Sequence, residues 1–395
     1  MEIVVIGGCG HVGLPLAVAL ANVGYEVISY DINQEAVDLV NSCITPFSEE
    51  NLEIELLKSI KLGFKATTDS SVIKSARVLI FIIGTPLNSG NLPDKSVVSK
   101  VISDLNHLFN DDQLIILRST VFPGCTLQIE NDLKSLNKNI DVTFCPERIA
   151  EGKAISELHN LPQIIGARSD KAFFRASELF SNLGVKIIRT TPEEAELAKL
   201  FTNAWRYLKF AIANEFWMIA NGLGVNFANI HDAVTFEYPR AVDLPIAGFA
   251  AGPCLFKDTV QLSSAYNSNF TLGNSAISIN QGLPKYIVER IKLKFPLKSL
   301  RVGILGMAFK AESDDIRSSL SYSLKEILLA ESEGVYTHDP YVTSDSELIA
   351  LDKLISQSDL LIIGAPHKIY KSLHTDKPLI DIWNLTGKGD LLLTN

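Results

Sequence analysis

The chain has 395 residues, more than one hydrophobic core usually supports, so we expect two or three domains. Its net charge of −9 comes from acidic and basic residues mixed along the chain, without a lysine–arginine block that could follow a phosphate backbone, which argues against a nucleic-acid partner. The longest apolar runs have the length of strands and end at Gly or Pro, so we predict no membrane insertion. The first residues lack the basic and long apolar segments of a secretory signal, and we expect a cytoplasmic protein.

The cysteines are odd in number, irregularly spaced and without a CxxC pair; they stand at positions 9, 43, 125, 145 and 254. This pattern argues against a disulfide framework and against a zinc knuckle. We therefore expect reduced thiols and no metal site.

The N-terminal part reads as a nucleotide-binding α/β domain. Residues 2–31 give a strand, a glycine turn, a helix and a second strand, which is a βαβ unit. Five more strand-like runs follow, "ARVLIFIIG", "QLIILRS", "DVTFCPE", "PQIIGA" and "VKIIRT", separated by helical or loop segments. This alternation is typical of a doubly wound sheet, and it predicts a first domain over residues 1–191.

A helical region follows. Pro192, with acidic residues in the first turn, opens a helix of about thirty residues that ends near Gly222 and Gly224. A second helix is predicted from about Asn274 to Phe295. The runs "SLRVGILGMAF", "GVYTHDP", "DLLIIGAP" and "PLIDIWN" then indicate more strands. We predict two Rossmann-like doubly wound α/β domains, 1–191 and 297–395, joined by a central helical region, 192–296, that contains one long helix.

The glycine turn suggests a cofactor. Gly8, Gly10 and Gly13 have GxGxxG spacing between a strand and a helix, where backbone N–H groups can meet a pyrophosphate. Asp31 ends the next strand, where a carboxylate holds ribose hydroxyls and repels a 2′-phosphate. The pattern predicts NAD binding rather than NADP binding, against the alternative of a turn that is merely tight.

Other polar residues are ambiguous when taken alone. Lys199 and Asn203 are four residues apart on one face of the long helix, which by itself is best explained as a solvated face. Glu147 and Glu151 could be surface acids. A ligand-binding role for both residues is favoured because they follow a strand, at the edge where open α/β sheets bind ligands.

Cys254 has three possible roles. A metal ligand would need His or Cys neighbours, which the sequence around it lacks. A buried, small apolar residue would be ordinary for a free cysteine. A nucleophile would profit from the charge of Lys257 and from the close approach that Gly248 and Gly252 allow. The local sequence leaves these roles open, and we expect the other cysteines to pack in cores or loops.

Seven segments, in order, extend over nearly the whole chain: "GGCGHVGLPLA", "GTPLNSGNLPD", "RSTVFPG", "CPERIAEG", "ELAKLFTNAWRYLKFAIANE", "GPCLFKDT" and "GILGMAFKAESDDIRSS". With them the chain resembles the UDP-glucose/GDP-mannose dehydrogenase family. The resemblance implies an N-terminal NAD domain, a central dimerisation region and a C-terminal domain that binds the nucleotide. It also implies a UDP-sugar as substrate and a homodimer or higher homo-oligomer.

The family's reaction is a twofold oxidation of the sugar C6 alcohol to a carboxylate, with two NAD and a cysteine thioester. By position, the resemblance implies that Cys254 traps the aldehyde as a thiohemiacetal. Lys199 would stabilise alkoxide charge, and Asn203 would orient the reacting oxygen. Asp258 would act with a water as a base or would orient Lys199.

Further roles follow from the same resemblance. Glu147 would be the general base of thioester hydrolysis, and Thr120 would place the water. The implied cofactor contacts are Gly8, Cys9, Gly10, His11, Val12, Gly13, Asp31, Thr85, Ser119, Thr120, Glu151, Lys257 and Arg317. The implied nucleotide-sugar contacts are Glu147, Arg148, Lys199, Asn203, Arg240, Gly248 and Phe249 of the loop 245–251, Phe309 and Lys310. In relatives, the arginine matching Arg240 reaches into the partner's site.

The segment "CPERIAEG" and the residues that follow it indicate which sugar is oxidised. UDP-glucose enzymes usually carry "PEF", whereas this chain has "PER" with Arg148, and "GKAISELHNLPQIIGA" is similar to the branch that acts on UDP-N-acetylhexosamines. Glu151 stands where many members of that branch have proline. We predict a UDP-N-acetylhexosamine, manno or gluco, with UDP-glucose and GDP-mannose as alternatives. The competing functions are a two-electron hydroxyacid dehydrogenase, against which the second α/β domain argues, and an inactive nucleotide-sugar sensor.

Overall fold

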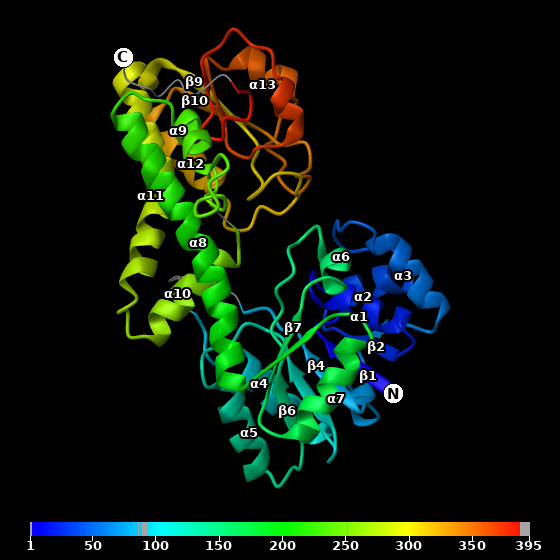
Figure 1. Cartoon of the computed structure of the whole chain (residues 1–395). Coiled ribbons are helices and arrows are strands. Elements are labelled where there is room, and N and C mark those ends of the chain that lie inside the picture. The colour runs from blue at the N-terminus through cyan, green and yellow to red at the C-terminus, as the bar shows by residue number, and fades with distance from the viewer. Residues whose placement is uncertain (1, 86, 89–92, 251, 388–395) are drawn as a thin grey trace. The chain divides into compact units, whose positions relative to one another are not determined.

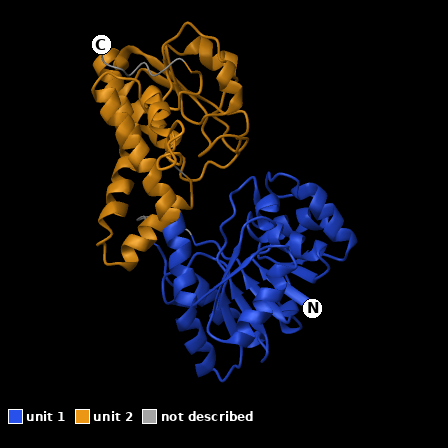
Figure 2. Ribbon diagram, viewed as in Figure 1, with its two compact units in different colours: residues 1–202 blue, residues 203–395 orange. Residues whose placement is uncertain are grey.

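The computed structural model describes residues 2–85, 87–88, 93–250 and 252–387. The chain forms two compact units, Met1–Thr202 and Asn203–Asn395 (Figures 1 and 2). The boundary falls inside α8 (Pro192–Gly222), the long helix that the sequence predicts from Pro192. The predicted α/β fold class is confirmed, whereas the three-part domain division stays a prediction.

The first unit is built on one sheet, which has eight strands among the described residues, in the order β3-β2-β1-β4-β5-β6-β7-β8. All neighbours are parallel except β6 and β7. The strands are β1 (Glu2–Ile6), β2 (Glu26–Tyr30), β3 (Lys65–Thr67), β4 (Val78–Phe81), β5 (Leu114–Leu117), β6 (Asp141–Phe144), β7 (Gln163–Ala167) and β8 (Ile187–Thr190). The helices before α8 are α1 (Gly13–Asn22), α2 (Gln34–Asn41), α3 (Leu52–Lys61), α4 (Val97–Leu105), α5 (Cys125–Ser135), α6 (Ala154–Leu158) and α7 (Asp170–Ser181).

Two hydrophobic cores cover the two faces of this sheet, because successive strand residues point to opposite faces. Ile3 and Val5 pack with α1, α2, α3, α6 and α7. Val4 and Ile6 pack with α4 and α5 on the other face. Runs such as β4 and β5 are buried at every residue, which explains why they read as continuous apolar segments.

The start of α8 is fixed to the first unit by a buried acid. Glu196 accepts hydrogen bonds from the backbone N–H of Gly124 at 2.6 Å and of Thr126 at 2.8 Å, at the first turn of α5. A carboxylate there meets the positive end of the helix dipole. Burial nevertheless raises the pKa of Glu196. This contact of Glu196 was not predicted from the sequence.

The second unit contains the rest of α8, further helices and a parallel sheet, which has four strands among the described residues, in the order β10-β9-β11-β12. Its strands are β9 (Arg301–Leu305), β10 (Gly334–His338), β11 (Leu360–Ile363) and β12 (Leu379–Ile380). Its other helices are α9 (Phe227–Thr235), α10 (Leu255–Ala265), α11 (Thr271–Lys294), α12 (Leu320–Glu331) and α13 (Leu351–Gln357). The helix predicted from Asn274 begins three residues earlier, at Thr271, and contains Pro284.

The second sheet also has a core on each face. Val302 and Ile304 of β9 pack with α8, α11 and α12, whereas Leu305 packs with α13 and Tyr370. Because the four strands are parallel, their carboxyl ends meet at one edge, and open α/β sheets bind ligands at that edge. No helix in the described part of the chain has the length and apolar character needed to span a membrane.

Candidate active site

The glycine turn between β1 and α1 has the close contacts of a dinucleotide-binding turn. A Cβ on Gly8 would lie 2.6 Å from Ser29 Oγ, and one on Gly13 would lie 2.2 Å from the Gly7 carbonyl oxygen. Gly10 is exposed, and the nearest atom to its Cβ position would be 3.9 Å away. Gly8 and Gly13 are thus required by packing, while Gly10 leaves the backbone open to a ligand.

Asp31 lies directly after β2 and holds this turn. Its Oδ2 accepts a hydrogen bond from the Cys9 N–H at 3.0 Å, and its Oδ1 accepts one from the Asn33 N–H at 3.1 Å. Burial, and then the Asp31 charge, raise the pKa of the Cys9 thiol to about 12, so this thiol is neutral. The ring of His11 lies 4.1 Å from that of Phe47. The half-exposed Asp31 carboxylate stands where the sequence predicts ribose recognition.

Replacing Asp31 by asparagine is expected to relax cofactor choice. Asparagine keeps an oxygen for the Cys9 N–H but removes the negative charge that repels a 2′-phosphate. We expect the ratio of kcat/KM for NAD to that for NADP to fall at least about 10-fold. Steady-state kinetics with both cofactors measure it, with the exposed Asp38→Asn as control. An unchanged ratio would contradict this role.

Polar residues at the carboxyl ends of β4 and β5 extend the same site. The Ser119 hydroxyl accepts a hydrogen bond from the Ile83 N–H at 2.6 Å and so joins the two strand ends. Thr85 and Thr120 lie half-buried beside them in sequence. Pro86 and residues 89–92 of the second motif lie outside the described residues.

Glu147 follows β6 as predicted, and its carboxylate is bound on both sides. One oxygen forms an ion pair with Arg118, and the other accepts hydrogen bonds from the N–H groups of Arg148 at 2.6 Å and Ile149 at 2.8 Å. The side chains of Arg118 and Glu147 are only 1% and 10% exposed, and burial lowers the pKa of Arg118 to about 10. The structure thus gives Glu147 a structural partner that the sequence analysis did not name.

Replacing Glu147 by glutamine is expected to destabilise the first unit, because it leaves the buried Arg118 charge without its counter-charge. We expect the unfolding temperature to fall by roughly 5–10 °C. Thermal unfolding followed by circular dichroism measures it, with Glu178→Gln, at an exposed acid of α7, as control. An unfolding temperature equal to that of the wild type would show that the ion pair contributes nothing.

Arg148 and Glu151 continue this segment. The Arg148 guanidinium donates to the Pro162 carbonyl, and burial lowers its pKa. Glu151 is half-buried, in the turn before α6. Lys199 is half-buried on α8, one turn before Asn203 and therefore on the same helix face.

The second unit joins three predicted residues into one buried group. Asn203 Nδ2 donates to Asp258 Oδ2 at 2.5 Å, and Lys257 Nζ lies 3.0 Å from Asp258 Oδ1. The Asp258 side chain is 1% exposed. A carboxylate this deeply buried requires both partners, so it fixes the amide of Asn203 and the ammonium of Lys257.

Cys254 immediately precedes the first residue of α10. Its side chain is exposed, whereas Cys9, Cys125 and Cys145 are buried and Cys43 is half-buried. The helix N-terminus favours a thiolate, and the Asp258 N–H already bonds to the Cys254 carbonyl at 2.9 Å. An exposed thiol at a helix N-terminus fits the predicted role of nucleophile and does not fit that of a buried, small apolar residue.

The predicted substrate loop is held by two buried asparagines. Asn214 Oδ1 accepts from the Gly248 N–H at 2.8 Å, while Asn214 Nδ2 donates to Asn280 Oδ1 at 2.9 Å. A Cβ on Gly248 would lie 2.2 Å from the ring of Trp383, so only glycine fits. Phe249 is buried, and Ala251 lies outside the described residues.

Phe309 and Lys310 lie next to the cysteine loop. Gly252 has φ +101°, and a Cβ on it would lie 2.6 Å from the Phe309 ring. Lys310 Nζ lies 5.5 Å from the centre of that ring. Arg317 pairs with Asp315, and Arg240 donates to Tyr238 Oη at 2.9 Å.

A cavity of about 340 Å³ in the second unit is lined in part by residues 381–385, which follow β12. Aromatic and apolar side chains dominate it, among them Trp217, Phe227 and Trp383, and the polar His231 and Asp381 also line it. The buried indole N–H of Trp383 has no acceptor among the described residues. The size and lining suit a planar ligand with polar edges, and the sequence analysis did not name these residues.

Comparison with known proteins identifies the class. Three models of the UDP-glucose/GDP-mannose dehydrogenase family match the chain: the NAD binding domain at residues 1–184, the central domain at 193–282 and the UDP binding domain at 303–388. A UDP-N-acetyl-D-mannosamine dehydrogenase from Pyrococcus horikoshii is 32% identical over 98% of this chain and 93% of its own length. The chain therefore belongs to the UDP-glucose/GDP-mannose dehydrogenase family. It is an NAD-dependent nucleotide-sugar dehydrogenase, as predicted.

Solved structures of nucleotide-sugar dehydrogenases are similar to this chain over nearly its whole length. The structure of a UDP-D-ManNAc dehydrogenase from Pyrococcus horikoshii matches with a TM-score of 0.90 and 30% identity, covering 100% of this chain and 96% of that one. A UDP-glucose dehydrogenase from Pyrobaculum islandicum matches with a TM-score of 0.89 and 25% identity, covering 96% and 93%.

Proposed function

We propose that this chain oxidises the C6 alcohol of a UDP-N-acetylhexosamine, in the manno or gluco configuration, to the carboxylate, using two NAD. The observation that carries the proposal is the exposed Cys254 thiol at the start of α10, one turn before the buried Asp258. A nucleophilic thiol is what allows one enzyme to pass from alcohol to acid.

NAD fits the turn of the first unit. Gly10 leaves room at the N-terminus of α1, and Asp31 would hold the ribose hydroxyls. Ser119, Thr85, Thr120 and Glu151 would complete the contacts that the first unit makes. Bound NAD accepts one hydride in each oxidation.

The first oxidation requires loss of the hydroxyl proton as the hydride leaves the alcohol carbon. We assign the stabilisation of the alkoxide to the Lys199 ammonium and the orientation of the oxygen to the Asn203 amide. Asp258, whose bond fixes that amide, acts with a water as the base or orients Lys199.

The second oxidation uses Cys254. Its thiolate adds to the aldehyde carbon and forms a thiohemiacetal, whose loss of hydride gives a thioester. Water then attacks the thioester, releasing the carboxylate and the thiol. Glu147 would activate this water and Thr120 would place it; the Glu147 oxygen that pairs with Arg118 has one hydrogen bond and can accept another.

The choice of sugar rests on Arg148 and on the relatives. Several similar proteins are named UDP-N-acetyl-D-mannosamine dehydrogenases, including those of Pyrococcus horikoshii and Methanocaldococcus jannaschii. UDP-glucose and GDP-mannose remain the alternatives, and an inactive sensor is the non-enzymatic one.

We assign the nucleotide end of the substrate to the second unit. The cavity beside Trp383 would take the uracil, against the aromatic side chains that line it. Gly248, Phe249, Phe309 and Lys310 would line the path toward Cys254, consistent with a UDP binding domain at residues 303–388.

Turnover with a panel of nucleotide sugars tests the proposal. NADH formation is measured with UDP-N-acetylmannosamine, UDP-N-acetylglucosamine, UDP-glucose and GDP-mannose at equal concentrations. We expect the highest kcat/KM with one of the two N-acetylhexosamines. A preference for UDP-glucose or GDP-mannose would overturn the substrate assignment, and no turnover with any of them would favour the sensor.

The active unit is proposed to be a homodimer formed through α8. Trp205, Ile212, Phe216 and Ile219 are 40% to 55% exposed, and their spacings of seven, four and three residues place them on one helix face. Such an apolar stripe is typical of a protein interface. Arg240, from the exposed turn after α9, would then serve the partner's site.

Replacing Phe216 by aspartate is expected to give a monomer with lower activity, because a charge in the stripe would have to be buried between subunits. We expect dimer dissociation to be favoured at least about 100-fold. Light scattering measures the mass, with Phe174→Asp on α7, where the side chain is 64% exposed, as control. A wild-type monomer, or a dimeric variant, would contradict the interface.

A further inference from the structure

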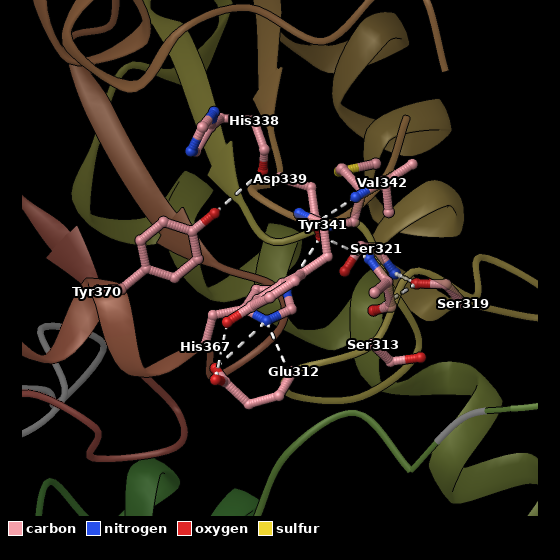
Figure 3. A network of polar contacts seen from close by, with 12 residues as sticks. Glu312, Ser313, Ser319, Ser321, His338, Asp339, Tyr341, Val342, His367 and Tyr370 are labelled. Atoms are coloured by element: carbon pink, nitrogen blue, oxygen red, sulfur yellow. Dashed lines mark hydrogen bonds and ion pairs between the residues drawn. The ribbon is translucent and has the colours of Figure 1, made fainter. Parts of the chain in front are cut away.

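A buried polar network lies where β10 and β11 end, and the function proposed above does not use its residues. Asp339 follows β10 and His367 follows β11, and both side chains are 0% exposed. Figure 3 shows them between Tyr370, Tyr341 and Glu312.

Asp339 binds the backbone of Met307 and Ala308, the first residues of the segment 307–312 that follows β9. Its Oδ2 accepts hydrogen bonds from Met307 N–H at 2.7 Å, Ala308 N–H at 2.9 Å and His367 Nε2 at 3.0 Å. Its Oδ1 accepts from Tyr341 N–H at 2.8 Å. Burial opposes its charge, but the His367 and backbone hydrogen bonds lower the pKa of Asp339 to about 2. Asp339 is therefore an ionised carboxylate whose acceptors are occupied by donors.

His367 binds the other end of the segment 307–312, at Glu312. Its Nδ1 accepts from the Glu312 N–H at 2.9 Å while its Nε2–H donates to Asp339, which requires one neutral tautomer. Glu312 has φ +53°, a backbone region that non-glycine residues avoid. Its carboxylate accepts from Lys368 N–H and from Tyr341 Oη, each at 2.8 Å. His367 thus binds one end of the segment 307–312 directly, at the Glu312 N–H, and the other end through Asp339.

This segment carries Phe309 and Lys310. The Phe309 ring covers Gly252, two residues before Cys254, so tightly that a Cβ there would lie 2.6 Å from the ring. The Lys310 ammonium lies 5.5 Å from the centre of the Phe309 ring. Both residues follow the carboxyl end of β9, and open α/β sheets bind ligands at the carboxyl ends of their strands. A cation and a ring held here could contact a nucleoside diphosphate only if the segment keeps its shape.

We propose that His367 is a positioning residue, which holds the segment 307–312 in the conformation that presents Phe309 and Lys310 to a nucleoside diphosphate. The proposal rests on the function proposed above for the choice of ligand. His367 itself is fully buried, and its effect passes through Asp339 and the Glu312 N–H.

Two substitutions separate the two bonds of the imidazole. His367→Gln places an amide N–H near the position of Nε2 and keeps the donor to Asp339, whereas His367→Asn places an oxygen near Nδ1 and keeps the acceptor for Glu312. We expect each variant to weaken UDP binding, measured by calorimetry, at least about 5-fold, and to raise KM for the nucleotide sugar similarly. The Kd for NAD is expected to stay within about twofold of wild type, since a local change in one segment leaves the glycine turn intact.

His374→Gln, an exposed histidine of the same stretch, is the control and is expected to match the wild type. Unchanged UDP affinity in both folded His367 variants would overturn the proposal, as would an equal loss of NAD affinity, which would indicate a general structural role. If the wild type turns over no nucleotide sugar, the proposed function fails, but the UDP affinities still decide this proposal.

Tyr341→Phe provides a test that does not disturb the buried pair. Tyr341 is 41% exposed, and the substitution removes only the hydroxyl that binds the Glu312 carboxylate. We expect UDP affinity to fall about 2- to 3-fold with NAD affinity unchanged. Wild-type UDP affinity in Tyr341→Phe, if the His367 variants do not fold, would overturn the proposal.

Discussion

Replacing Cys254 by serine is expected to reduce uronic acid formation at least about 1,000-fold. The thiolate is a far stronger nucleophile than a serine hydroxyl at neutral pH, and without it no thioester forms from which the acid is released. The exposed position before α10 means that the substitution leaves the core unchanged, so the variant is expected to unfold at the wild-type temperature. Chromatographic quantification of the sugar acid measures the loss.

Cys43→Ser is the matched control, because Cys43 is a half-buried thiol of the first unit with no proposed role. We expect it to form acid at the wild-type rate. Acid formation by Cys254→Ser within about 10-fold of wild type would exclude the covalent mechanism.

Replacing Asp258 by asparagine is expected to lower kcat about 100-fold, with a smaller effect on KM for the nucleotide sugar. The new amide nitrogen would face either the Lys257 ammonium, which pairs with the carboxylate, or the Asn203 amide nitrogen, which donates to it, and neither of these groups can accept a hydrogen bond. The substitution keeps the shape of the side chain but removes its charge and one acceptor, so it tests whether the chemistry needs the carboxylate. Steady-state kinetics and thermal unfolding are measured on the same preparation.

Asp352→Asn is the control, since Asp352 also lies in the first turn of a helix, α13, but is exposed. We expect kinetics equal to wild type. An Asp258→Asn enzyme with wild-type kcat would remove Asp258 from the chemistry and leave it a purely structural role.

Features encoded within a short stretch of chain could be predicted from the sequence. The glycine turn and Asp31 belong to one βαβ unit, and the structure joins them by the bond from the Cys9 N–H. The helix α8 begins at Pro192 and ends at Gly222, as the start and stop signals indicate. The strand β3 was not predicted, because three residues with an exposed lysine give no apolar pattern.

Contacts between distant residues could not be predicted in this way. Asn203 and Asp258 are 55 residues apart, so their bond depends on how α8 and α10 pack. The pair Arg118 and Glu147 is separated by 29 residues and crosses from the end of β5 to the end of β6.

The contacts of His367 also join residues far apart in the sequence and could not be predicted from it. A lone histidine after "IIGAP" carries no local signal, and its partners come from the ends of β9 and β10. Asp339 did have a signal, since it ends the second strand of a βαβ unit as Asp31 does. In this unit, however, the acid binds the protein's own turn and a histidine.

The stoichiometry of the reaction tests the central claim most directly. A known, limiting amount of UDP-N-acetylmannosamine, or of whichever nucleotide sugar turns over fastest, is consumed completely with excess NAD, and NADH and sugar products are quantified. The thioester mechanism through Cys254 predicts two NADH and one uronic acid per sugar. One NADH per sugar, with the aldehyde as the final product, would contradict it.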